Sequence, residues 1–153
     1  QDPAGALADY DSAIALYRGP LMEEEFDDWI EAQRARYEGL FVAALAEAGD
    51  LHLQSGQAET AAAYFRTLVE RDPIDERASS SLMQALGELG DREAIDREFS
   101  RVRQTLADER GAVPQPGSHL AYEQALQAVS SSEAEPAVAQ SMRQGPARRV
   151  ERS

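Results

Sequence analysis

The chain has 153 residues, of which 42% are hydrophobic and 28% are charged, so it can bury one core under a well-solvated surface. Its formal net charge of −13 repels the phosphate backbone of nucleic acids, so this segment is not expected to bind them directly. It has no cysteine, no recognisable secretion signal and no apolar stretch of the roughly 20 residues that a membrane helix needs. These features predict a cytoplasmic protein without disulfides or membrane contact.

Hydrophobic residues recur at helical spacing along nearly the whole chain, and no segment alternates like a half-buried strand. The first helix is predicted over residues 3–17, and the Gly-Pro pair at 19–20 ends it. A longer helix begins at Asp27 or Asp28, because carboxylates favour a helix N-terminus, and it stops at Gly56. Later helices are predicted over residues 58–71, 75–89, 91–110 and, where Ser118 offers a cap, 118–129.

The pattern changes at residue 130, where a run of three serines opens a polar segment with two prolines. We predict that residues 130–153 form a flexible tail outside the domain of residues 1–129. Four arginines gather in this tail, at Arg143, Arg148, Arg149 and Arg152. They either contact phosphate groups or form a solvated extension that rests on the acidic body.

An internal repeat emerges when the chain is compared with itself, because Gly56 aligns with Gly90 and Phe65 with Phe99 at a spacing of 34 residues. This is the period of the tetratricopeptide repeat, a helix–turn–helix unit with small residues at the helix contact, a glycine turn and a packed aromatic ring. The positions that carry the pattern are Gly49, Gly56, Ala61, Phe65 and Pro73 in the first unit and Gly90 and Phe99 in the second. The fold is therefore predicted to be all-α, a tetratricopeptide-like right-handed stack of antiparallel helix hairpins with about six helices. A plain helical bundle is the alternative.

The second unit departs from this pattern. Met83 and Ile95 replace the small residues, and Ala107 replaces the proline. We expect the two helices of this unit to lie further apart than those of the first.

The helix predicted over residues 3–17 corresponds to the second helix of a pair whose first helix would precede residue 1. We therefore expect the chain to be a piece of a longer protein. An unpartnered apolar stripe on this helix, formed by Leu7, Tyr10 and Ile14, is a candidate partner-binding surface and favours a homodimer over a monomer.

Residues with catalytic or metal-binding chemistry are not gathered anywhere in the sequence. His52 and His119 are far apart and have no ligand cluster around them. No glycine-rich phosphate loop and no nucleophile motif is present. We expect no enzymatic activity, no cofactor and no metal.

Four further residues are candidates for contact with a partner protein. Trp29 either packs in the core or anchors a partner. Arg34, Arg97 and Arg101 either bind acidic groups of a partner or lie on solvated faces with intrahelical ion pairs, as Glu93 with Arg97 would.

Short blocks of sequence also resemble a known family. They are residues 16–21 (Leu-Tyr-Arg-Gly-Pro-Leu), 28–31 (Asp-Trp-Ile-Glu) and 111–116 (Gly-Ala-Val-Pro-Gln-Pro). In order and spacing, these blocks resemble the bacterial transcriptional activator domain of regulators of the Streptomyces antibiotic regulatory protein type. The resemblance covers about residues 1 to 129.

This resemblance implies a C-terminal effector or oligomerisation module of a DNA-binding transcription regulator. Its winged helix–turn–helix domain would be absent from this chain, and the module would act by protein–protein contact. The implied partners are the transcription machinery, the regulator's own DNA-binding domain or a second copy. The alternative function is a stand-alone tetratricopeptide-type adaptor that binds a peptide or a partner protein.

Overall fold

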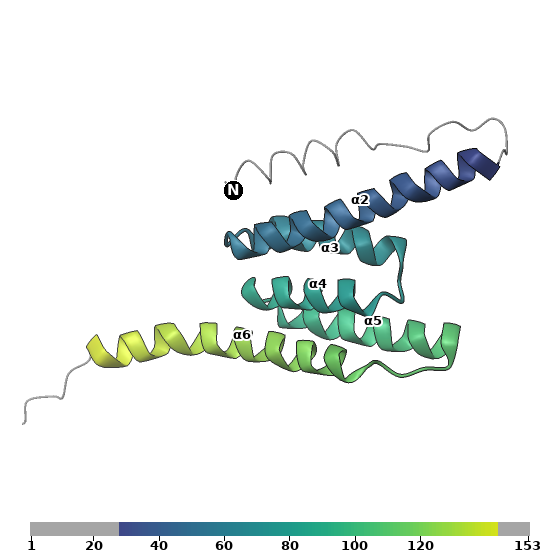
Figure 1. The fold of residues 1–153 in the computed structure, drawn as a ribbon. Coiled ribbons are helices and arrows are strands. Elements are labelled where there is room, and N and C mark those ends of the chain that lie inside the picture. The colour runs from purple at the N-terminus through teal and green to yellow at the C-terminus, as the bar shows by residue number, and fades with distance from the viewer. Residues whose placement is uncertain (1–27, 144–153) are drawn as a thin grey trace, which may run out of the picture.

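The computed structural model describes residues 28–143, and in that range it contains five α-helices and no strand (Figure 1). The helices are α2 (Asp28–Gln54), α3 (Ala58–Arg71), α4 (Glu76–Glu88), α5 (Arg92–Arg110) and α6 (Pro116–Arg143). The all-helical class is confirmed, and the predicted bounds of α2 to α5 agree with the observed ones to within about a residue. The helix predicted over residues 3–17 lies outside the described residues.

The two helix turns at Gly56 and Gly90 have the same geometry. Their φ angles are 75° and 73°, a left-handed conformation that glycine adopts without steric cost. The amide of Gln57 donates to the carbonyl of His52 at 2.8 Å, and 34 residues later the amide of Asp91 donates to the carbonyl of Leu86 at 3.1 Å. The hairpins α2–α3 and α4–α5 are therefore two copies of one unit, as the tetratricopeptide-like prediction requires.

Close packing in the first unit depends on Gly49. A Cβ atom placed there would lie 2.6 Å from Cε1 of Phe65, so only a glycine leaves room for this ring against α2. Phe65 is 1% exposed, and Ala61 is fully buried beside it on α3. The first unit thus has the small-residue contact and the packed ring of the repeat.

The second unit packs differently, because Met83 stands where the first unit has Gly49 and is itself fully buried. With a methionine at this place, the ring of Phe99 is only half-buried. It stacks instead on Tyr122 of α6, with ring centroids 4.4 Å apart and an interplanar angle of 18°. The aromatic residue of the second unit therefore contributes to the docking of α6, while the expected wider spacing of α4 and α5 stays a prediction.

Helix α4 is the centre of the stack, since it packs against α3, α5 and α6 (Figure 1). A Cβ at Gly87 would lie 3.0 Å from the backbone of Ala125, so α4 and α6 approach closely at this point. At the other end of the contact, the Glu76 carboxylate accepts hydrogen bonds from the Ser118 hydroxyl and, at 2.7 Å, from the Gln115 amide. These two attachments fix α6 along α4.

The predicted limits of the last helix are wrong at both ends. It begins at Pro116 rather than at a Ser118 cap, because the Ser118 hydroxyl bonds to α4 and proline suits a first helical turn. It continues past Val129 to Arg143. The hydroxyls of Ser130 and Ser131 donate to carbonyls four residues earlier, so these serines remain within the helix instead of ending it. The predicted flexibility of the tail is untested, and residues 144–153 lie outside the described range.

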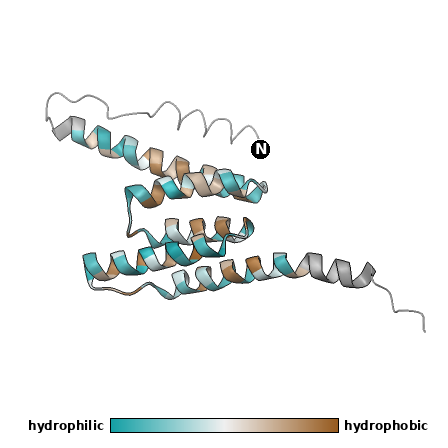
Figure 2. Cartoon of the chain, turned by 180° about the vertical axis from the view of Figure 1, so that it is seen from behind, coloured by the Kyte–Doolittle hydropathy of each residue, from teal (hydrophilic) through white to brown (hydrophobic). Residues whose placement is uncertain are grey.

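The hydrophobic core is continuous across the hairpins. Figure 2 shows hydrophobic residues recurring among hydrophilic ones along the helices, as expected when one face of each helix is buried. The core contains Leu45 of α2, Phe65 of α3, Met83 of α4 and Val129 of α6. No helix in the described part of the chain has the length and apolar character needed to cross a membrane.

Candidate protein-binding groove

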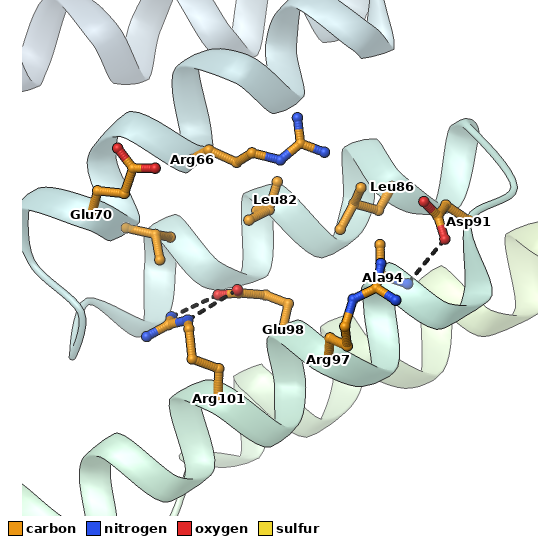
Figure 3. A pocket seen from close by; sticks show the side chains of 10 residues that line it. Arg66, Glu70, Leu82, Leu86, Asp91, Ala94, Arg97, Glu98 and Arg101 are labelled. Carbon is orange, nitrogen blue, oxygen red and sulfur yellow. Dashed lines mark hydrogen bonds and ion pairs between the residues drawn. The ribbon is translucent and has the colours of Figure 1, made fainter.

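A groove of about 500 Å³ lies between α3 and α5 and crosses the surface of α4 (Figure 3). Its walls are mostly charged residues of α3 and α5, and its floor is apolar. The residues that line it are Arg66, Val69, Glu70, Leu82, Leu86, Asp91, Ala94, Arg97, Glu98 and Arg101. Three different helices and one helix cap supply these residues, so the groove is a product of tertiary packing.

The floor consists of Val69 from α3 with Leu82 and Leu86 from α4. These side chains are almost completely buried, and they belong to the hydrophobic core. Burial at native packing density holds them in fixed rotamers. The floor is therefore a rigid surface that needs no rearrangement before a partner packs on it.

One wall carries an ion pair that joins three segments. The guanidinium of Arg101 donates to both carboxylate oxygens of Glu98, at 2.7 and 3.0 Å. It also donates to the carbonyl of Pro73 and to the hydroxyl of Ser79, both at 2.9 Å. Because the Glu98 side chain is only 9% exposed, this network neutralises a carboxylate that would otherwise be buried alone.

The other charged side chains of the groove differ in their hydrogen-bond and ion-pair partners. Asp91 caps α5, and its carboxylate accepts a hydrogen bond from the Ala94 amide at 3.0 Å. Arg97 lies 3.3 Å from Glu93 in an exposed intrahelical pair. Within the part of the chain that the structure describes, Arg66 makes no hydrogen bond or ion pair. Arg66 and Arg97 are therefore the solvent-accessible cations of this groove, although Arg97 already has Glu93 as an exposed ion-pair partner.

The structure brings together two of the candidate partner-binding residues, Arg97 and Arg101, which both line the groove. Arg101 is held by its internal bonds, which favours a structural role for it, whereas Arg97 is exposed. Arg34 lies on α2, away from the groove, and is half-buried. Trp29 belongs to α2 but its side chain is outside the described part, as are residues 7, 10 and 14.

Sequence reasoning did not identify Arg66, Leu82 or Leu86 as parts of a site. No local pattern reveals that Arg66 of α3 faces α5 across α4, because this proximity arises only when the two hairpins stack. Leu82 and Leu86 are four residues apart and so share a helix face, but this spacing is the usual mark of a core position and does not indicate a groove.

Two smaller grooves lie on other faces of α4. One, of about 200 Å³, is between α2 and α4, and the other, of about 390 Å³, is between α4 and α6. The second is lined mostly by small or uncharged side chains such as Ser80, Gln84 and Gln124, with Arg77 and Glu88 as its charged residues. They offer hydrogen-bonding groups but few charges, so the groove between α3 and α5 has the stronger means of selecting a partner.

An aromatic cluster joins α5 to α6 outside these grooves. The ring of Phe99 stacks on Tyr122 and meets His119 edge-on at a centroid distance of 5.1 Å. The Tyr122 hydroxyl donates to the Asp96 carboxylate at 2.7 Å, and this hydrogen bond, with smaller contributions from burial and from the carboxylate charge, raises the pKa of Tyr122 above 10. The cluster has the chemistry of a helix contact.

Metal-binding clusters are not found among the described residues, where no group of three or more His, Cys, Asp or Glu side chains could hold an ion. Of the two histidines considered in the sequence, His52 is buried in α2 near Tyr64, and His119 packs on Phe99. The two lie on different helices with different neighbours.

The stacked hairpins, with their matching turns 34 residues apart, define a tetratricopeptide-like helical repeat domain. Comparison with protein families gives a match to the bacterial transcriptional activator domain over residues 1–129. The chain belongs to this family, which confirms the resemblance seen in the sequence blocks. Comparison with curated proteins gave no match, and comparison with solved structures gave none either.

Proposed function

We propose that this domain is the effector module of a DNA-binding transcription regulator and that it works by contacting other proteins. The observation that carries the proposal is the groove between α3 and α5, which is open, rigid at its floor and edged by charges from two helices. Such a combination of apolar floor and charged rim suits a polypeptide partner. Membership of an activator family supplies the link to transcription.

DNA binding belongs, in this proposal, to a separate domain of the regulator. The net charge of −13 supports this division, because a surface of that sign repels DNA. The candidate partners are the transcription machinery, the DNA-binding domain of the same regulator and a second copy of this chain. The proposed place of action is the cytoplasm, where bacterial DNA lies.

The decisive experiment separates activation from DNA binding. The complete chain is fused to an unrelated DNA-binding domain whose operator lies upstream of a weak bacterial promoter, and reporter expression is measured. The proposal predicts expression above that given by the DNA-binding domain alone. Gel-shift measurement shows that the fusion binds its operator. A fusion that occupies the operator without raising expression contradicts the proposal and favours the stand-alone adaptor.

Self-association is tested on the isolated chain. Sedimentation equilibrium across a range of concentrations distinguishes a monomer from a dimer. A dimer supports an oligomerisation role. A monomer at all concentrations would exclude that role and leave contact with other proteins as the proposed function.

A further inference from the structure

Three arginines line the groove between α3 and α5, and two of them, Arg66 and Arg97, are exposed. Figure 3 shows that Arg66, from α3, and Arg97, from α5, both reach toward the region of Leu86. The two arginines come from opposite walls, so their charges bracket whatever lies between them. Their aliphatic stems add apolar surface beside the floor.

The three acidic residues that line the groove differ in the contacts that their carboxylates make. Glu98 is neutralised by Arg101, and the Asp91 carboxylate is engaged in capping α5. Glu70 is exposed, and in Figure 3 the Arg66 side chain extends away from it, so the guanidinium and the Glu70 carboxylate lie apart. The lining thus has three positive and three negative side chains, and Arg66 and Arg97 are its two exposed cations on a chain whose overall charge is strongly negative.

We infer that this groove binds an acidic, amphipathic peptide segment of a partner protein. Its carboxylates would pair with Arg66 and Arg97 from the two walls, and its apolar side chains would pack over Leu82 and Leu86. Guanidinium groups suit this task, because they pair with carboxylates in a fixed planar geometry and lose little hydration. A small inorganic anion would use the arginines but not the floor, so the floor argues for a peptide.

The inference rests on the proposed function, because it names the chemistry of the partner. It also explains how a chain of net charge −13 can attract an acidic segment: the attraction is confined to one groove, and the Debye length of about 8 Å at physiological salt screens the distant carboxylates. Binding is then expected to weaken as salt is added.

The test measures the binding of a fluorescently labelled amphipathic peptide of glutamate and leucine to the full 153-residue chain. Fluorescence anisotropy gives the dissociation constant for the wild type and for the double variant Arg66→Glu with Arg97→Glu. Reversal of both charges replaces two attractions by two repulsions, so affinity is expected to fall at least about tenfold. Both side chains are exposed, so the variant should fold normally, and circular dichroism checks this.

A matched control carries the same change of net charge elsewhere. Arg36→Glu with Arg103→Glu reverses two exposed arginines outside the groove and should change the affinity by no more than about twofold. A second peptide with glutamine in place of glutamate should bind at least about tenfold more weakly to the wild type. The inference is overturned if both double variants bind alike, if the glutamine peptide binds as well as the acidic one, or if the acidic peptide does not bind.

Failure of this inference and failure of the proposed function give different results. If the fusion activates its reporter but the groove variant binds the acidic peptide as tightly as the wild type does, the groove inference fails and the proposed function stands. If the peptide binds through Arg66 and Arg97 but the fusion never activates, the groove inference stands and the activator role fails.

Discussion

Gly49 offers the sharpest test of how the first repeat unit is packed. In a Gly49→Ala variant, the new Cβ would lie 2.6 Å from Cε1 and 2.9 Å from Cζ of Phe65, closer than such atoms approach in real proteins. The ring is 1% exposed and has no solvent to move into. Gly39 in the same helix is the matched control, because a Cβ there meets nothing within 4 Å.

The two substitutions share one effect and differ in another. Both replace a helical glycine by alanine, which stabilises a helix by about 0.8–1 kcal/mol. Only Gly49→Ala also overpacks a core, which costs about 1–3 kcal/mol. We therefore expect Gly39→Ala to raise the free energy of unfolding by about 1 kcal/mol and Gly49→Ala to lower it by up to about 2 kcal/mol. The difference between the variants measures the overpacking alone.

The assay is urea unfolding of the complete chain followed by far-ultraviolet circular dichroism. For a chain of this size, each kcal/mol also shifts Tm by about 2–4 °C. Adding Phe65→Leu should reduce the penalty of Gly49→Ala below the sum of the two single effects, because a smaller side chain leaves room for the methyl group. Equal stability of Gly49→Ala and Gly39→Ala would refute the assigned role of Gly49.

Three further predictions concern polar groups. Arg101→Ala leaves a buried carboxylate without its partner and should lower the free energy of unfolding by about 3 kcal/mol, whereas Arg97→Ala, which removes an exposed pair, should change it by less than about 0.5 kcal/mol in the same urea titration. Asp91→Ala removes a helix cap and should cost about 1 kcal/mol, while an unchanged denaturation midpoint would contradict the cap. Because the hydrogen bond to Asp96 raises the pKa of Tyr122, the folded state keeps this proton to higher pH than the unfolded state. Stability should therefore fall as pH rises above 10, and the fall should be smaller in Tyr122→Phe, as thermal unfolding at several alkaline pH values would show.

The repeat could be predicted from sequence because its signals are local or strictly periodic. A glycine with positive φ at the end of a helix has a strong physical cause, so Gly56 and Gly90 mark the two turns without any tertiary information. The end of α6 could not be predicted in this way. A serine hydroxyl can bond to the preceding helical turn or compete with it, and the bonds of Ser130 and Ser131 decide the matter only in the folded chain.

Only some residues of the groove could be predicted from the sequence, for a related reason. Arg97 is recognisable as an exposed cation from the helical pattern of its own segment. Arg66 becomes its counterpart only because two hairpins stack so that α3 and α5 face each other across α4. Arg101 was a candidate for partner binding but is held by internal bonds, and its acceptors at Pro73 and Ser79 lie 28 and 22 residues away in sequence. A pattern of spacings within one helix contains no information about such partners.

The departure of the second unit from the repeat pattern has a structural consequence that links the groove to α6. Met83 takes the place of a small residue, the ring of Phe99 lies toward Tyr122, and this stacking helps to hold α6. Gly87 admits α6 on one side of α4, while the adjacent Leu86 supplies the groove floor on another. Since α6 takes up its own side of α4, the side between α3 and α5 stays open. The irregular second unit thus both seats the last helix and leaves the charged groove accessible to a partner.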